Sequence, residues 1–354
     1  MNALFSQDAR QGRLTTALGQ DALVLLRMNG DEELSGDFTW QIEALGTASG
    51  LDLEALLGTH ATVEIDMAGG TRHFDGIVCE ASHGGAAENG WRYDLVLRPW
   101  LHVAGLRRNQ RIFHDRTVIQ IVEEVLADYT DLGDPHLEIS TSQDYPVLEY
   151  TVQYGESDAD FVRRQLERHG ISWAWTHSEG SHAMVLVDDV SALPDIPGGT
   201  RPYRPVDGHH LSEEEHFRTW SGAKRITTGA VRLTEYNFKT PNAAQEVDRS
   251  GDACHTRGNV ESFDWPGDYL SNEEGKGLVA RRLMAERGQA PRHRAEGNVA
   301  GLGAGGCVKI SGDELSEVTA DVSYVFRPGT AFDHWPTAPA TRTGTSGPMT
   351  ELMC

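Results

Sequence analysis

The sequence predicts an α+β protein in which β-structure dominates and which contains more than one domain. Three observations support this. The chain has 354 residues, more than one ordinary hydrophobic core accommodates. Before about residue 106, apolar and polar residues alternate with the period of two that is typical of β-strands. In the middle of the chain, two segments with helical spacing interrupt this pattern, and further strands follow them.

The first part of the chain, residues 1–106, is expected to form a small antiparallel barrel. Its clearest strand covers residues 91–98, where four apolar side chains share one face: Trp91, Tyr93, Leu95 and Leu97. Residues 63–67 alternate in the same way, and the Gly69–Gly70 pair marks the turn that follows. Short strands separated by glycine turns at this spacing are typical of a barrel.

Residues 107–205 are expected to form a compact α+β insertion. A first helix covers residues 118–126, and Thr117 with Gln120 supplies a capping box at its start. A second helix covers residues 158–169 and turns three apolar side chains inward: Phe161, Val162 and Leu166.

Two strands complete the insertion. They cover residues 171–175 and 184–187 and are joined by a polar turn at 177–180. The segment 194–202 is rich in proline and glycine and is expected to be a loop that ends the domain.

Residues 206–327 are expected to form a second barrel with a helical insertion at about 241–300. Strands resume at 231–238, and a helix begins near Ser271, where Ser271 and Glu274 form a second capping box. A last strand alternates over residues 318–326. Residues 328–354 are rich in proline, threonine and glycine, and we expect an unstructured tail there.

The composition narrows the possible functions. The net charge is −22, which argues against nucleic-acid binding and against adhesion to an anionic membrane, because both depend on Lys and Arg. The four cysteines lie far apart and form no C-x-x-C pair, so a reducing compartment is expected. The start of the chain lacks the apolar core of a secretory signal, and no apolar run reaches membrane-spanning length.

Several motifs suggest chemistry, but each has a simpler explanation. Gly301, Gly303 and Gly306 have the spacing G-x-G-x-x-G. A dinucleotide site needs this loop between a strand and a helix, whereas here it is expected to follow a helix and to lead into a strand. We therefore interpret the loop as a turn. Asp188 and Asp189 end a strand and are also expected to form a turn.

The histidine-rich segment 209–216 is the best candidate for metal binding. His209 and His210 precede three acidic residues and His216. Adjacent histidines on an extended chain point to opposite sides, and no H-E-x-x-H spacing is present. A solvated acidic loop is favoured. Neither a G-x-S-x-G elbow nor a P-loop occurs in the sequence. The sequence therefore predicts no catalytic, cofactor-binding or metal-binding residues, and no enzyme.

Five stretches of the sequence resemble the VgrG spike proteins of type VI secretion in order and spacing. The strongest is YTVQYGESDADFVRRQLERHGISWAW at residues 150–175. The others are FDGIVCEA (74–81), LRPWLHVAGLRRNQRIFHDRTVIQIVEEVL (97–126), HFRTWSGAKRITTGAVRLTEYNFKTP (216–241) and WPGDYLSNEEGKGLVARRLMAERG (265–288). The resemblance extends over about residues 5 to 310.

The resemblance implies a structural hub at the base of a spike in a contractile injection machine. The family part that matches is similar to the baseplate hub of contractile phage tails, with two tube-type β-barrels, α/β insertions and a trimeric ring. The implied partners are two further copies of the chain, the hexameric secretion tube protein, baseplate components, and an effector or a separate spike chain. The implied location is the cytoplasm before firing, followed by secretion or injection without a signal peptide.

The sequence departs from the family near its end. The stretch CVKISGDELS at residues 307–316 loses the family pattern, and the residues after 326 do not resemble it. Family members usually continue into a further barrel and a β-helical needle. Two alternatives therefore stay open: a stand-alone hub of the phage-tail kind, and a truncated adaptor for an effector without its own needle. An enzyme, such as a metal-dependent hydrolase using the His209 region, is the third alternative.

Overall fold

A computed structural model describes residues 6–67, 70–131, 133–205, 214–251 and 260–311, and the strand backbones at 315–318, 321–326 and 349–353. The chain divides into two compact units. The larger contains residues 1–167, 171–220 and 295–353, and the smaller contains residues 168–170 and 221–294. Within the described residues, no helix is both long enough and apolar enough to cross a membrane. The structure is mainly β, as predicted.

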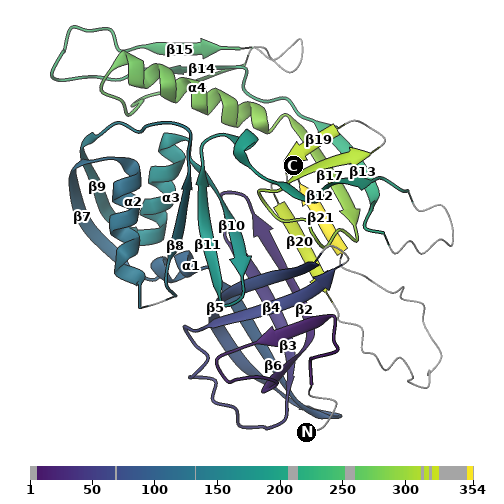
Figure 1. The fold of residues 1–354 in the computed structure, drawn as a ribbon. Helices are drawn as coiled ribbons and strands as arrows, with labels where there is room; N and C mark the ends of the chain where they lie inside the picture. The colour runs from purple at the N-terminus through teal and green to yellow at the C-terminus, as the bar shows by residue number, and fades with distance from the viewer. Residues whose placement is uncertain are drawn as a thin grey trace. The chain divides into compact units, whose positions relative to one another are not determined.

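The largest element is a curled sheet of ten strands (Figure 1). Its order is β1 (Gly12–Thr15), β4 (His60–Met67), β5 (Gly70–Ala87), β6 (Gly90–Arg98), β3 (Phe38–Gly46), β2 (Leu23–Glu33), β20 (Asp321–Phe326), β21 (Met349–Met353), β17 (Pro291–Gly297) and β13 (Phe217–Lys224). Strands β1 to β6 pair antiparallel with their neighbours. Strand β20 pairs antiparallel with β2, so the two ends of the described chain meet in one sheet.

The core of this sheet follows from the alternation in its sequence. Tyr93, Leu95 and Leu97 on β6 are buried, as predicted. Trp91 is only partly buried, as is Met67 at the end of β4. The largest fully buried side chains include Phe38, Trp40, Phe74 and Trp100.

The α+β insertion contains α1 (Trp100–Ala104), β7 (Arg108–Arg116), α2 (Val118–Leu126), η2 (Ala127–Tyr129), β8 (His136–Ser140), β9 (Leu148–Ser157), α3 (Asp158–His169), β10 (Ser172–Ser178), β11 (Ser181–Val187) and η3 (Val190–Ala192). The capping box of α2 is present as predicted. The inner stripe of α3 is buried as predicted, and Phe113 stacks on Phe161 with ring centroids 5.5 Å apart.

Three predictions about strands are wrong. The segment 194–202 is not a loop: it forms β12 (Asp195–Pro202), which lies parallel to β18 (Cys307–Ser311) at the edge of a small sheet that also includes β19 (Leu315–Val318). An edge strand tolerates proline, since one side of its backbone has no ladder partner. Gly198 and Gly199 adopt positive φ where the register shifts.

The other two errors concern strand ends. Strand β10 continues through His177 to Ser178, so the turn to β11 is shorter than predicted. The single strand predicted at 318–326 is divided between β19 and β20, and residues 319–320 lie outside the described residues. The Gly69 half of the predicted glycine turn also lies outside them.

The smaller unit contains β14 (Ala230–Leu233), β15 (Val247–Ser250), β16 (Glu261–Asp264) and α4 (Asn272–Gly288). Leu278, Val279 and Leu283 of α4 share a core with Val231 and Leu233 of β14. The Ser271 side chain accepts a hydrogen bond from the Glu274 amide as predicted, but the Glu274 carboxylate accepts from the amide of Leu270.

Two further segments differ from expectation. The strand predicted at 231–238 ends at Leu233, and the Asn237 side chain accepts from the Lys239 amide in the turn that follows. In the segment expected to be an unstructured tail, residues 349–353 form β21, and residues 328–348 lie outside the described residues.

Candidate functional site

The principal candidate site is a buried polar network inside the larger unit, centred on Asp75. The Asp75 side chain has no exposed surface. Its carboxylate lies 2.8 Å from Nδ1 of His60, 2.8 Å from Nδ1 of His182 and 2.7 Å from Oγ1 of Thr62. A buried carboxylate without partners is very costly, and here three groups from two distant parts of the sequence surround it.

The strand register explains how these residues meet. Thr62 on β4 lies directly opposite Asp75 on β5, and His60 is two positions away from Thr62 on β4. Residues two apart on a strand point to the same face, so both donors of β4 reach the carboxylate. His182 comes from β11 of the insertion. The network therefore joins the insertion to the ten-stranded sheet, which we call the first sheet.

Hydrogen bonds fix the protonation of His182. The amide N–H of Trp100 donates to Nε2 of His182 over 3.0 Å, so Nε2 carries no proton. The ring proton is therefore on Nδ1, which donates to Asp75. Burial lowers the pKa of His182 to about 4, although the hydrogen bond to Asp75 acts in the opposite direction. The ring is therefore neutral at pH 7.

The pKa of His60 shifts in the opposite direction. Burial lowers its pKa, but the hydrogen bond and charge of Asp75, with a hydrogen bond to the Gly133 backbone, outweigh burial and raise it. Burial raises the pKa of Asp75, but its bonds to the two histidines and Thr62 outweigh burial, so that pKa is lowered. Both shifts favour the charged form of each partner, and the 2.8 Å contact between His60 and Asp75 offsets the cost of burying the carboxylate.

These residues are the described group whose donor types best suit a metal ion. One ligand-type atom each of His60, Asp75 and His182 lies within 4.8 Å of the others. However, a metal on Nδ1 of His182 would move the ring proton to Nε2, where it would face the amide proton of Trp100. The 2.8 Å separations are also those of hydrogen bonds. The arrangement therefore fits a hydrogen-bonded network better than a metal centre.

A second buried carboxylate extends the network. Glu32 on β2 is 2% exposed and accepts from the amide of Ala304 over 3.2 Å. Nη2 of Arg72 lies 3.6 Å from it. Burial raises the pKa of Glu32, but His177, Arg72 and the Ala304 amide outweigh burial and lower it. Arg72 also donates to the carbonyl oxygens of Ala300, over 2.6 Å, and Leu302.

His177 lies between the two carboxylates. Its Nε2 is 3.6 Å from Oε1 of Glu32, and its Nδ1 is 3.0 Å from the carbonyl oxygen of Asp75. The network thus runs from the loop at 300–304 through Glu32 and His177 to Asp75, His60 and His182.

The glycine motif at 301–306 belongs to this network. The prediction that it follows a helix is wrong, because β17 precedes it, whereas β18 follows it as predicted. It forms turns and opens no helix, as expected. The loop lines a groove of about 480 Å³ together with Arg72, Trp175 and His177.

The described part of the histidine-rich segment begins at residue 214, and there Glu215 contacts the network's loop: it accepts from the amide of Ala300 over 3.1 Å. His209, His210 and Glu213 lie outside the described residues. Glu215 pairs with Arg201 at 2.7 Å, and the His216 ring hydrogen-bonds to the Glu214 carbonyl oxygen.

Asp188 and Asp189 hold turns, as predicted. Asp188 accepts from the amides of Ser142 and Gln143, and Asp189 accepts from the amide of Ser191.

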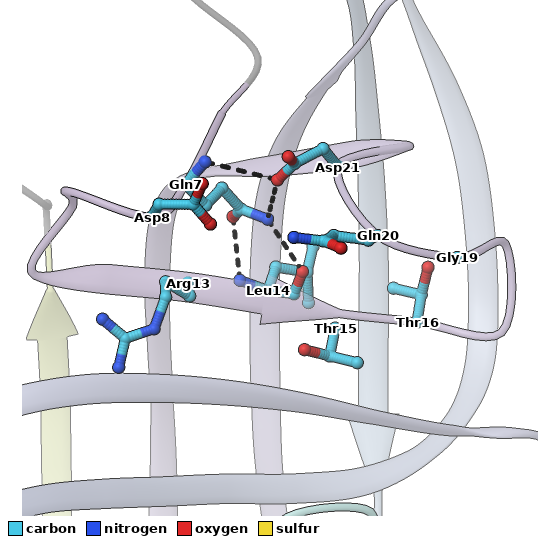
Figure 2. A pocket seen from close by; sticks show the side chains of 9 residues that line it. All are labelled: Gln7, Asp8, Arg13, Leu14, Thr15, Thr16, Gly19, Gln20 and Asp21. Atoms are coloured by element: carbon cyan, nitrogen blue, oxygen red, sulfur yellow. Dashed lines mark hydrogen bonds between the residues drawn. The ribbon is translucent and has the colours of Figure 1, made fainter.

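A smaller hollow of about 230 Å³ lies near the start of the chain. Figure 2 shows the Gln7 side chain between Leu14 and Asp21. Its amide oxygen accepts from the amides of Leu14 and Leu25, and its amide nitrogen donates to the carbonyl oxygens of Leu14 and Leu23. Gln7 thus bonds to the backbones of both β1 and β2, which indicates a structural role for the hollow.

Sequence reasoning did not find the buried network. One signal was present: Glu32 follows Met28 and Gly30 at a spacing of two on β2, so it occupies an inward position. Asp75 gave a weaker signal, because β5 is buried without alternation from Phe74 to Val78. Both carboxylates are covered and partnered, so the arrangement suits fastening chain segments together better than attacking a substrate.

The comparison with known families assigns the chain to a class of structural proteins, the hubs of phage tail baseplates. The profile of the phage tail baseplate hub (GPD) family matches residues 31–327, and the chain belongs to that family.

Individual relatives agree. The chain is similar to the type VI secretion system spike proteins VgrG1b (33% identical over 309 residues) and VgrG1c (34% over 310) of Pseudomonas aeruginosa. Each match covers 87% of this chain but only 41% and 42% of the relatives, so the chain spans about four-tenths of their length.

A solved E. coli structure shows the same fold. That protein is described as a component of the type VI secretion system with structural similarity to the T4 bacteriophage tail proteins gp27 and gp5. The TM-score is 0.68 at 17% identity, and the match covers 96% of this chain and 76% of that one.

Proposed function

We propose that this protein is the structural hub of the spike in a type VI secretion machine, where it joins the tube to the spike and helps deliver effectors. The match to the baseplate hub family over residues 31–327 carries the proposal. The similarity to VgrG spike proteins favours type VI secretion over a phage tail as the setting.

The proposed partners follow from this role. Three copies of the chain form a ring, which contacts the hexameric secretion tube protein on one side and baseplate components on the other. Two tube-type barrels in each chain, at residues 1–106 and 206–327, match the six-fold tube. The chain resides in the cytoplasm before firing and is then secreted or injected.

Light scattering coupled to size-exclusion chromatography tests the ring. We expect the mass of three chains at micromolar concentration, because obligate rings bury large apolar interfaces. Co-purification with the tube protein of the same organism tests the second contact. A stable monomer that does not retain the tube protein would contradict the proposal.

The second candidate is an adaptor that carries an effector or a separate spike chain. Pull-down with the neighbouring gene products, using the full chain and a chain ending at Pro328, distinguishes the two. Retention of an effector only by the full chain, without tube binding, would favour the adaptor.

A further inference from the structure

The hydrogen bond from the Trp100 amide to His182 can exist only while His182 is neutral. Nε2 of His182 accepts this bond over 3.0 Å, and Nδ1 faces Asp75 over 2.8 Å. A protonated ring carries hydrogen on both nitrogens. Its Nε2 proton would then point at the Trp100 amide proton, in a place where the side chain has no exposed surface. A charged His182 therefore cannot keep its present position.

The groups that face His182 come from every strand packed against it. Asp75 of β5 accepts from it, His60 of β4 shares that carboxylate, and His177 of β10 lies beside it with ring centroids 6.2 Å apart. His177 in turn lies beside Glu32, and Glu32 lies beside Arg72. Burial and the neighbouring His177 and His60 lower the pKa of His182, whereas its hydrogen bond and attraction to Asp75 raise it.

The same ring is packed among aromatic side chains. It lies 5.3 Å from Phe38 and 5.6 Å from Trp175, measured between ring centroids, and Trp175 contacts Trp100 at 5.3 Å. Phe38 belongs to the first sheet, whereas Trp175 belongs to the insertion. Movement of the His182 ring would therefore separate surfaces that hold the two parts together.

We propose that the network around Asp75 is a pH-sensitive latch: protonation of His182 in mild acid releases the β10–β11 hairpin and the loop at 300–304 from the first sheet, which itself stays folded. The loop is included because Glu32 and Arg72 hold it, and His177 of the hairpin lies between Glu32 and Asp75. This device goes beyond the proposed hub role and does not depend on it.

The direction of the pH effect follows from the two histidines. The pKa of His182 is lowered to about 4 in the closed latch, against about 6.5 when exposed. The closed form is therefore stabilised above pH 6.5, and this stability is lost as the pH falls towards 4. The pKa of His60 is raised, so its contribution is complete below pH 6.5 and is lost at higher pH. Between pH 6.5 and 5, His182 sets the direction of the pH dependence, and the population of the open latch should increase about tenfold.

Hydrogen–deuterium exchange on the full chain at pH 6.5 and pH 5, corrected for the intrinsic exchange rate, tests the latch. We expect about tenfold faster exchange at pH 5 in peptides covering residues 172–187 and 299–306, and unchanged protection in β3 at the centre of the first sheet. Equal protection of the hairpin at both pH values would overturn the proposal, as would a uniform loss of protection that includes β3.

Substitution of His182 identifies the group. His182→Gln cannot be protonated, so its hairpin should exchange at the same corrected rate at both pH values. The matched control is His114→Gln, which changes an exposed histidine of β7 and should keep the wild-type response. A pH response that persists in His182→Gln would assign the effect to another group and refute the proposal. If His182→Gln does not fold, the wild-type chain still tests the latch, because exchange in the β10–β11 hairpin can be compared with exchange in β3 at both pH values.

Discussion

Phe161 provides the most direct test of packing at the scale of a single residue. Its ring is fully buried and stacks on Phe113. We expect Phe161→Ala to lower the free energy of unfolding by about 3–5 kcal/mol, because it removes a buried ring and leaves a cavity. Urea denaturation measures the change. Glu167→Ala, at an exposed position of the same helix, is the control and should change stability by less than about 0.5 kcal/mol. Similar losses in both variants would contradict the packing described here.

Buried apolar residues and buried polar residues differ in how well the sequence predicts them. Phe161, Val162 and Leu166 could be predicted, because an apolar stripe at helical spacing identifies its own buried face. The Asp75 network could not, because its partners belong to strands far apart in the sequence. Nothing near Asp75 in the chain indicates that His182 will reach it, since that contact depends on how the insertion packs on the sheet.

At the scale of elements, the start of α2 tests local capping. The Thr117 side chain accepts from the Gln120 amide over 3.3 Å, and the Gln120 side chain accepts from the Thr117 amide over 3.0 Å. We expect Thr117→Ala to cost about 1 kcal/mol of stability, since an amide at the helix start loses its acceptor. Thr117→Ser keeps the hydroxyl and should recover most of this loss. Thermal unfolding of both variants measures the effect, and equal melting temperatures for them would contradict it.

The elements also show where local sequence signals fail. The bounds predicted for α3 and the start predicted for α2 are those of the structure, because caps and periodicity are local features. Strand β12 was predicted to be a loop from its prolines and glycines. Its strand character depends on β18, more than a hundred positions later in the chain, and no local signal reports such a partner. The same limit explains why the strand predicted at 318–326 was not divided correctly.

At the scale of the whole molecule, the charge of −22 should act on assembly. Bringing three such chains into the proposed ring concentrates like charges, and salt screens their repulsion. We expect the trimer fraction at a fixed chain concentration to rise between 20 and 300 mM NaCl. Over this range the Debye length falls below about 10 Å, so the charges of neighbouring chains repel each other less. Analytical ultracentrifugation measures this fraction. A trimer that dissociates as salt is added would show that ion pairs between chains dominate instead.

The pairing of β2 with β20 also has a consequence for the order of events during synthesis. Strand β2 leaves the ribosome long before its neighbour β20, because residues 34–320 are made between them. The hydrogen bond between Glu32 and Ala304 must also form late, because these residues are 272 positions apart. Until β20 emerges, that side of β2 presents unpaired backbone groups, which are templates for pairing with other chains. Nascent chains of this protein should therefore depend on holding chaperones until β20 has been made, and this sheet can be completed only after that point.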